Sequence, residues 1–164
     1  MGWKSKPEFQ RGDSGQRLIS EWLKHRGWLV IPSYDYTGAT EKAPRMQGIQ
    51  SSFVLPDIDL SKSGKRCWAE VKTKSSSTLH RKTGILEHGF ALRHYRDYLR
   101  VEKESGCTVF LIVYELDTTE ILSSSLSSLG KGRIYTGDKM DRGGTIFWPR
   151  TQFRIIGRIT DNSP

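Results

Sequence analysis

The sequence predicts an α/β protein in which a mixed central sheet is flanked by helices. Three observations predict this fold class. A stretch near the start places apolar residues at helical spacing. Short apolar stretches that alternate like strands follow it. The stretch from Thr108 to Leu116 is almost continuously apolar, which is typical of a strand buried on both faces.

The first helix is expected to begin at a cap at Asp13 or Ser14 and to run to about Arg26. Gly27 is a good helix terminator. Residues 1–9, which precede the helix, are expected to form a mobile arm. The apolar stripe of the helix consists of Leu18, Ile19, Trp22 and Leu23.

Three strands are expected next, at residues 28–32, 55–60 and 67–72. The long polar loop from Tyr34 to Ser52 separates the first two, and such loops are usually functional or mobile. A Ser-Gly turn at residues 61–65 joins the last two into a hairpin.

A flexible basic loop, residues 75–84, leads to a second helix that runs from Phe90 or Ala91 to Glu104 and ends at Gly106. The buried strand at 108–116 follows, so the core order is helix, strand, strand, strand, helix, strand. We expect one domain over residues 1–164, with a core at about 10–116.

The remaining residues, 117–164, are expected to form a C-terminal β/α extension. A short helix is predicted over Ile121–Leu129, and a hairpin joins 133–136 to 145–148 around Gly143-Gly144. Residues 153–156 add a strand or a short helix. Trp148 and Phe153 are expected in the core.

The composition favours a soluble protein with a polyanionic partner. The chain of 164 residues carries a net charge of +8, which is common in nucleic-acid-binding proteins. No stretch is apolar enough to span a membrane, no signal segment is visible, and a cytoplasmic location (of the host cell, or the virion, for a viral protein) is expected. Cys67 and Cys107 are expected to be buried free thiols.

Charged residues at strand spacing mark the candidate site. Because side chains alternate along a strand, Glu70 and Lys72 share one face with Trp68, and Asp57 shares a face with Asp59. If the two strands pair, carboxylates and an ammonium converge at one edge of the sheet. Carboxylates suit Mg²⁺ or Mn²⁺, and a lysine beside such a metal can act on water.

Pro56-Asp57 and Glu70-Val71-Lys72 resemble the PD-(D/E)XK nuclease superfamily, which includes restriction enzymes and Holliday junction resolvases. The stretch from Gly12 to Ile19 (GDSGQRLI) is also similar. The resemblance implies a restriction-endonuclease-like core and a Mg-dependent endonuclease that acts on DNA. Its products would carry a 5′-phosphate and a 3′-hydroxyl.

The resemblance also implies roles for single residues. Asp57 and Glu70 would bind the metal, with the carbonyl of Val71 as a further ligand, and Lys72 would position water or stabilise charge. Gln16 stands where resolvase-like members commonly carry a glutamate. Asp13 or Glu21 could take that place, or no residue does.

Asp59 is the alternative to Asp57, and the Pro-Asp pattern favours Asp57. His94 with Tyr98 is weakly similar to a Gln-x-x-x-Tyr helix motif of exonuclease branches, although both could be ordinary helix-surface residues. The segment from Thr73 to Arg96 holds five Lys or Arg and one acid, so it is expected to contact DNA. The expected DNA-binding residues are Lys74, Arg81, Lys82, Arg93 and His94.

Other functions stay open at this point. An exonuclease or an RNA-directed nuclease uses the same site. A nucleic-acid-binding or virion assembly protein could keep the fold without cleavage, and Gln16 is the best support for it. A homodimer is also open, because junction-cutting relatives are typically dimers.

Overall fold

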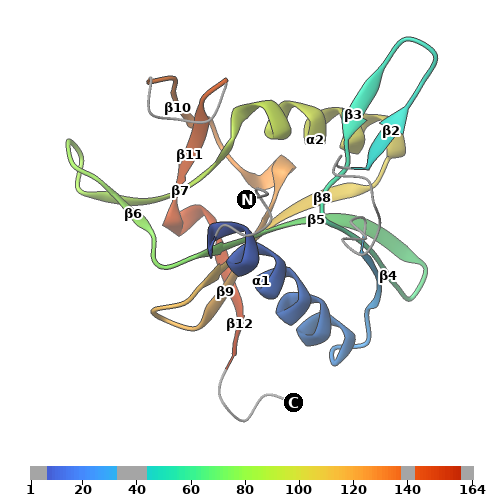
Figure 1. Ribbon diagram of the computed structural model, residues 1–164, viewed down its shortest axis with the longest axis horizontal. Helices are drawn as coiled ribbons and strands as arrows, with labels where there is room; N and C mark the ends of the chain where they lie inside the picture. Colours follow the sequence, from blue (N-terminus) through green and yellow to red (C-terminus); the bar gives the residue numbers. More distant parts are fainter. Residues whose placement is uncertain (1–6, 33–43, 138–142, 160–164) are drawn as a thin grey trace.

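A six-stranded mixed sheet forms the centre of the computed structural model, which describes residues 7–32, 44–137 and 143–159 (Figure 1). Its strand order is β1-β4-β5-β8-β9-β12. β5 and β8 pair in parallel, and every other neighbouring pair is antiparallel. The strands are β1 (Leu29–Pro32), β4 (Ile58–Lys62), β5 (Lys65–Lys74), β8 (Thr108–Glu115), β9 (Glu120–Ser125) and β12 (Arg154–Arg158).

Two helices pack against opposite sets of side chains on β5, as the alternation of a strand requires. α1 (Pro7–Lys24) shares a core with Ala69 and Val71 of β5. α2 (Leu92–Ser105) shares the other core with Trp68 of β5. The main apolar contacts of the helices are Ile19, Trp22 and Leu23 of α1, and Leu92, Tyr98 and Val101 of α2.

A second, four-stranded antiparallel sheet has the order β10-β11-β7-β6. One of its faces joins the α2 core through Phe90, Ile146 and Trp148. Because neighbouring residues of a strand point to opposite faces, the residues between them face outward. The strands are β6 (Thr78–His80), β7 (Ile85–Ala91), β10 (Arg133–Tyr135) and β11 (Thr145–Pro149).

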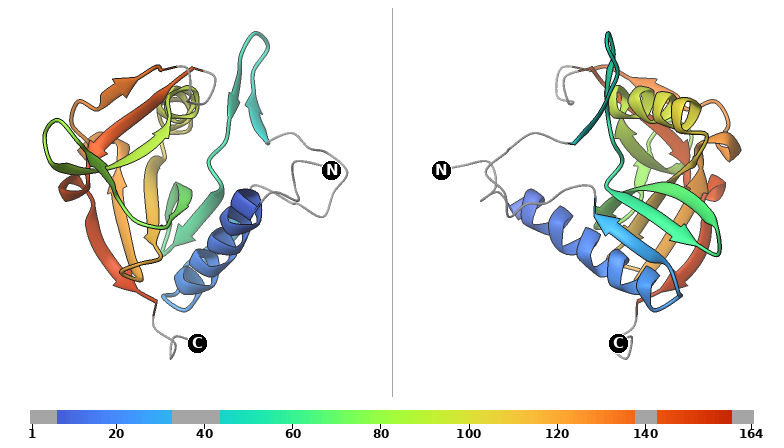
Figure 2. Two further views of the ribbon diagram at one scale, coloured as in Figure 1. Left: turned by 60° about the vertical axis from the view of Figure 1, so that its left-hand side comes forward. Right: turned by 90° about the vertical axis from the view of Figure 1, so that its right-hand side faces the viewer.

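A third element is the hairpin of β2 (Arg45–Gln47) and β3 (Ser52–Val54), which projects from the rest of the molecule (Figure 2). Its base is attached to α2, because the N–H of Val54 donates a 3.0 Å hydrogen bond to Oδ2 of Asp97. The polar loop predicted over Tyr34–Ser52 therefore contains β2 and the first residue of β3; its residues 34–43 lie outside the described part of the chain.

Both helices differ at their starts from the sequence prediction. α1 begins at Pro7, so the mobile arm predicted for 1–9 is wrong for residues 7–9, and Ser14 lies inside the helix. Proline suits the first helical position because its φ is already helical and it needs no N–H partner there. α2 begins at Leu92, since Phe90 and Ala91 belong to β7. Its end at Gly106, in the left-handed region, is confirmed.

Two predicted segments are strands in the structure. The flexible loop over 75–84 contains β6, which pairs with β7. The helix predicted over Ile121–Leu129 is wrong, because β9 extends to Ser125 and only a 3₁₀ turn, Leu126–Ser128, follows. β9 pairs with β8 on one side and β12 on the other, and this pairing outweighs the local helical pattern.

Several predictions from the C-terminal third are confirmed. β10 and β11 form the expected hairpin, and residues 154–158 add a strand. Trp148 and Phe153 are buried in the core.

Both cysteines are free, Cys67 buried and Cys107 partly buried. Neither described helix is long and apolar enough to cross a membrane.

A close contact between α1 and β5 at Gly15 fixes where the helix lies. A Cβ atom at Gly15 would stand 1.6 Å from Oγ1 of Thr73, whose hydroxyl is buried. Only a residue without a side chain lets the helix approach the strand this closely. The next residue of the helix is Gln16, so this contact also determines how near Gln16 comes to β4 and β5.

We expect Gly15→Ala to lower the free energy of unfolding by about 1–3 kcal/mol, because the added methyl group overlaps the β-branched side chain of Thr73, whose hydroxyl is buried. Thermal unfolding followed by circular dichroism measures the change. Ser14→Ala, at the exposed neighbouring position in the same helix, is the matched control and should change stability by less than about 0.5 kcal/mol. Equal effects of the two variants would contradict the close approach.

Candidate active site

Asp57 and Glu70 come together at the start of β4. In the β4–β5 pair Ile58 lies opposite Ala69, and continuing this register by one residue places Asp57 opposite Glu70. Directly opposite residues of antiparallel strands share a face. The N–H of Val71 also donates a 2.9 Å hydrogen bond to Oδ2 of Asp57. The predicted convergence of two carboxyl groups therefore occurs.

Both carboxyl groups are buried, with exposed fractions of 9% for Asp57 and 1% for Glu70. Burial, followed by the charge of Glu70, raises the pKa of Asp57 to about 8. The Lys72 ammonium and the Val71 N–H act in the opposite direction and do not outweigh these two causes. Two neighbouring buried carboxylates need a compensating positive charge, which a proton or a metal ion can supply.

Lys72 supplies a positive charge to the same place. Its Nζ lies 2.5 Å from Oε1 of Glu70, and its side chain is 35% exposed. The ammonium thus reaches from the buried carboxylate toward solvent. The other oxygen of Glu70, Oε2, is buried and accepts no hydrogen bond from an N–H or hydroxyl group of the described residues, while the Asp57 and Glu70 carboxyl groups are close enough to share a proton. A buried carboxylate oxygen without such a donor is costly, so this atom fits a ligand position.

The donor atoms match a hard divalent cation. The site offers two carboxyl groups from Asp57 and Glu70, and within the described ranges no group of three or more Asp, Glu, His or Cys gathers as a complete cage. Mg²⁺ is commonly bound through one or two carboxylates together with water and substrate phosphates. The predicted ligand role of the Val71 carbonyl stays a prediction.

Gln16 reaches the site from α1. Its Nε2 donates a 3.3 Å hydrogen bond to the backbone carbonyl of Asp57, and the residue is buried. Gln16 therefore holds the backbone that carries the carboxylate. Glu21, an alternative in the sequence, is not at the site, because it forms an exposed ion pair with Lys24. The side chain of Asp13 lies outside the described part of the chain.

Asp59 has a different partner. It accepts hydrogen bonds from Nε and Nη2 of Arg66, the latter at 2.6 Å, and lies opposite Trp68 on the strand pair. An acid neutralised by arginine is a poor competitor for a metal. The geometry therefore favours Asp57, as the Pro-Asp pattern does.

His94, on α2, lies close enough to the site for the charges of Glu70 and Lys72 to affect its pKa. Burial lowers its pKa, the Glu70 carboxylate opposes that shift, and the Lys72 ammonium adds to it. Its ring centre lies 6.1 Å from that of Tyr98, which is buried. Tyr98 is therefore a core residue, and the alternative that both are helix-surface residues is wrong for it.

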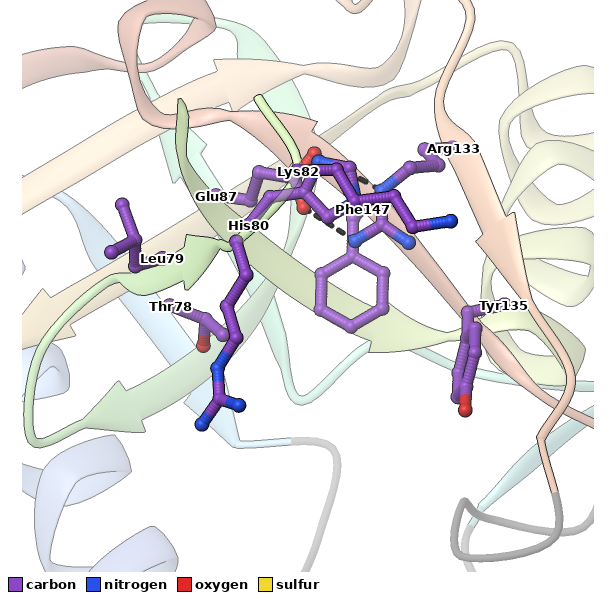
Figure 3. Close-up of a pocket in the computed structure, with 9 residues that line it drawn as sticks. Thr78, Leu79, His80, Lys82, Glu87, Arg133, Tyr135 and Phe147 are labelled. Carbon is purple, nitrogen blue, oxygen red and sulfur yellow. Dashed lines mark hydrogen bonds and ion pairs between the residues drawn. The ribbon is translucent and has the colours of Figure 1, made fainter. Parts of the chain in front are cut away.

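The other predicted DNA-binding residues are spread over several elements. Lys74 ends β5 and is partly buried, and Arg93 is exposed on the first turn of α2. Arg81 and Lys82 lie in the exposed turn between β6 and β7. This turn borders an open pocket that could not be predicted from the sequence, because Arg133 and Tyr135, from a hairpin distant along the chain, complete it (Figure 3).

Solved structures resemble this fold at low sequence identity. Hjc, a Holliday junction resolvase from the archaeal hyperthermophile Archaeoglobus fulgidus, superposes with a TM-score of 0.55 at 12% identity, over 87% of this chain and 91% of the resolvase. D212, a nuclease from a fusselovirus, gives 0.46 at 14% identity over 87% and 82%. No protein-family profile and no curated sequence matches the chain. The likeness to Hjc shows that the chain has a nuclease-like fold.

We expect Asp57→Asn to stabilise the protein when chelator keeps metal away. In the unfolded chain Asp57 ionises near its ordinary pKa of 3.8, whereas the folded pKa is about 8. Folding therefore costs more as pH rises through this window, and the cost is fully present above about 8. The variant should gain little at pH 4 and about 2 °C or more in Tm at pH 8.5.

Asp59→Asn, two residues further on, is the matched control. It removes the partner of Arg66, so it should lower Tm or leave it unchanged at pH 8.5. Thermal scans of both variants across pH measure the difference. A lower Tm for Asp57→Asn at high pH would contradict the raised pKa.

Proposed function

We propose that the chain is a metal-dependent DNA endonuclease. One observation carries the proposal: the carboxyl groups of Asp57 and Glu70 are buried side by side, with a Glu70 oxygen that lacks an N–H or hydroxyl donor among the described residues and the ammonium of Lys72 at the same point. A structural ion pair needs one acid and one base. A second buried acid beside it calls for a further positive charge, which a divalent cation would supply.

Each residue would have a separate task in phosphodiester hydrolysis. A bound divalent ion supplies a nucleophile from water near neutral pH and offsets charge on the phosphate. Asp57 and Glu70 would hold that ion, and Gln16 would hold the backbone of Asp57 in place. Lys72 is paired with a carboxylate, which favours its charged form, so it is better suited to orient water or bind the phosphate than to remove a proton.

DNA is the proposed substrate for two reasons. The net charge of +8 favours a polyanion. The structural neighbour Hjc is a Holliday junction resolvase, so a branched DNA is the first substrate to test. A structure-selective, recombination-related activity is the version of the proposal that this neighbour favours. A homodimer stays a prediction, which sedimentation of the free protein would test.

A non-catalytic nucleic-acid-binding protein of the same fold is the second candidate. It is favoured by Gln16, which contributes a hydrogen bond to a carbonyl where relatives of this kind commonly place a carboxylate. This candidate predicts tight DNA binding without strand cleavage in the presence of Mg²⁺ or Mn²⁺.

Cleavage assays separate the two candidates. We expect metal-dependent cutting of a four-way junction or nicking of supercoiled plasmid, and none in chelator. Asp57→Asn and Lys72→Ala should each lower the rate about 100-fold or more, since each removes part of the charge at the reacting phosphate. The readout is the cleavage rate at saturating protein.

Asp59→Asn serves as the control for a lost acidic residue on the same strand and should retain activity within a few-fold, because Asp59 is bound to Arg66. Metal-dependent unfolding gives a second readout. Mn²⁺ should raise the Tm of the wild-type protein and not that of Asp57→Asn. Cleavage that survives Asp57→Asn, or that proceeds in chelator, would rule out the proposed site.

A further inference from the structure

The outer face of the β10-β11-β7-β6 sheet has no role in the proposed chemistry. Alternate residues of these strands point away from the core, as the register shows: Arg133 lies opposite Phe147, and Phe147 lies opposite Gly89. Glu87 lies opposite Thr78 on the next pair of strands. These side chains surround an open pocket of about 470 Å³, a size typical of sites for small ligands (Figure 3).

The floor of the pocket is an aromatic ring held in a fixed place. A Cβ atom at Gly89 would stand 2.6 Å from Cε1 of Phe147, so the ring lies directly across the glycine backbone. The Arg133 guanidinium lies 4.5 Å from the centre of this ring. Nε of Arg133 donates a 3.2 Å hydrogen bond to Oε1 of Glu87, and Nη2 bonds the other oxygen. Figure 3 shows the three side chains together.

Arg133 is therefore suited to stack against a ring through its guanidinium plane, because its charge is already paired with Glu87. Glu87 is buried and neutralises it, and the paired hydrogen bonds fix the plane of the guanidinium. Tyr135, two residues after Arg133 on the same face of β10, is 48% exposed. An exposed aromatic ring and a fixed guanidinium plane are the groups on which unpaired bases stack.

The rim of the pocket carries the free positive charge. Arg81 and Lys82 are both exposed in the turn after β6, and neither forms an ion pair with a carboxylate of the described residues. His80 is held within the same turn by a 2.7 Å contact between its Nδ1 and Oγ1 of Thr83. A nucleotide could thus place its base against the stacking surfaces and its phosphate at the rim.

The pocket is also close to the candidate active site along the chain. Lys72 lies on β5 and Thr78 begins β6, so at most about 22 Å of extended chain separates Lys72 from the near edge of the pocket. Tyr135 lies three strands further across the sheet, about 14 Å. Successive phosphates of one strand of B-DNA rise about 3.4 Å along the axis, so a DNA strand of about ten nucleotides can reach both sites.

We propose that this pocket binds an unpaired nucleotide of the DNA substrate, within about ten nucleotides of the bond that is cut. The inference rests on the proposed nuclease function and adds a substrate class to it: DNA with an unpaired or easily opened segment beside the cut. Stacking on Tyr135 and Arg133 recognises the base, and Arg81 with Lys82 binds the backbone.

The test measures binding in chelator, so that no cleavage occurs. Fluorescence anisotropy compares a labelled duplex with a central gap of three unpaired thymidines and the same duplex fully paired. We expect the gapped DNA to bind about 5-fold or more tightly. Tyr135→Ala should reduce affinity for gapped DNA by about 5- to 100-fold with little effect on paired DNA, and Tyr135→Phe, which keeps the ring, should not.

Two further variants separate stacking from charge. Arg133→Lys keeps the charge and removes the plane, so it should also lose the preference for gapped DNA. Changing both Arg81 and Lys82 to Gln should reduce the slope of log affinity against log salt by about 1.4, at about 0.7 for each lost contact to a single strand. Lys103→Gln, an exposed change near the end of α2, should leave this slope unchanged.

Equal binding of gapped and paired DNA by the wild-type protein, or unchanged binding in Tyr135→Ala, would overturn the pocket proposal. The nuclease proposal is judged separately, by cleavage in Mg²⁺ and its loss in Asp57→Asn. Pocket-dependent binding without cleavage would contradict the nuclease alone. Metal-dependent cleavage with binding that ignores Tyr135 would contradict the pocket alone.

Discussion

The burial of two carboxyl groups beside each other is the constraint on which the rest of the site depends. Burial, followed by the charge of Glu70, raises the pKa of Asp57 to about 8. The surrounding groups reduce this cost without removing it: an N–H from Val71 and the ammonium of Lys72. The remaining cost favours the uptake of a positive charge, which a proton supplies below about pH 8 and which a metal ion would supply in our proposal.

β5 connects this site to both halves of the fold. One of its faces anchors α1 through Ala69 and Val71, and the other carries Trp68 and Glu70 toward α2. The close approach at Gly15 lets α1 bring Gln16 to the backbone of Asp57. β5 carries Glu70 and Lys72 and also packs against both helices. The geometry of the site therefore depends directly on the packing of the core.

The β10-β11-β7-β6 sheet adds a pocket with an aromatic floor and a basic rim to the molecule. Its inner face closes the α2 core with Trp148, and its outer face presents stacking groups and cations. A glycine at position 89 makes both possible, because a side chain there would displace Phe147. The same sheet therefore contributes to stability with one face and, in our proposal, to substrate choice with the other.

Features that depend on local geometry could be predicted from the order of the residues alone. Strand alternation placed Glu70 and Lys72 on one face, continuous apolarity marked β8, and Gly106 marked the end of α2. The pairing of segments could be read only from the folded molecule: the partner of Asp59 is Arg66, and β9 is a strand because it has neighbours on both sides. Periodicity is a property of a single segment, whereas pairing depends on residues that are distant along the chain. The pocket lined by β6 and β10 could not be predicted, because these strands are far apart in the sequence and are brought together only by folding.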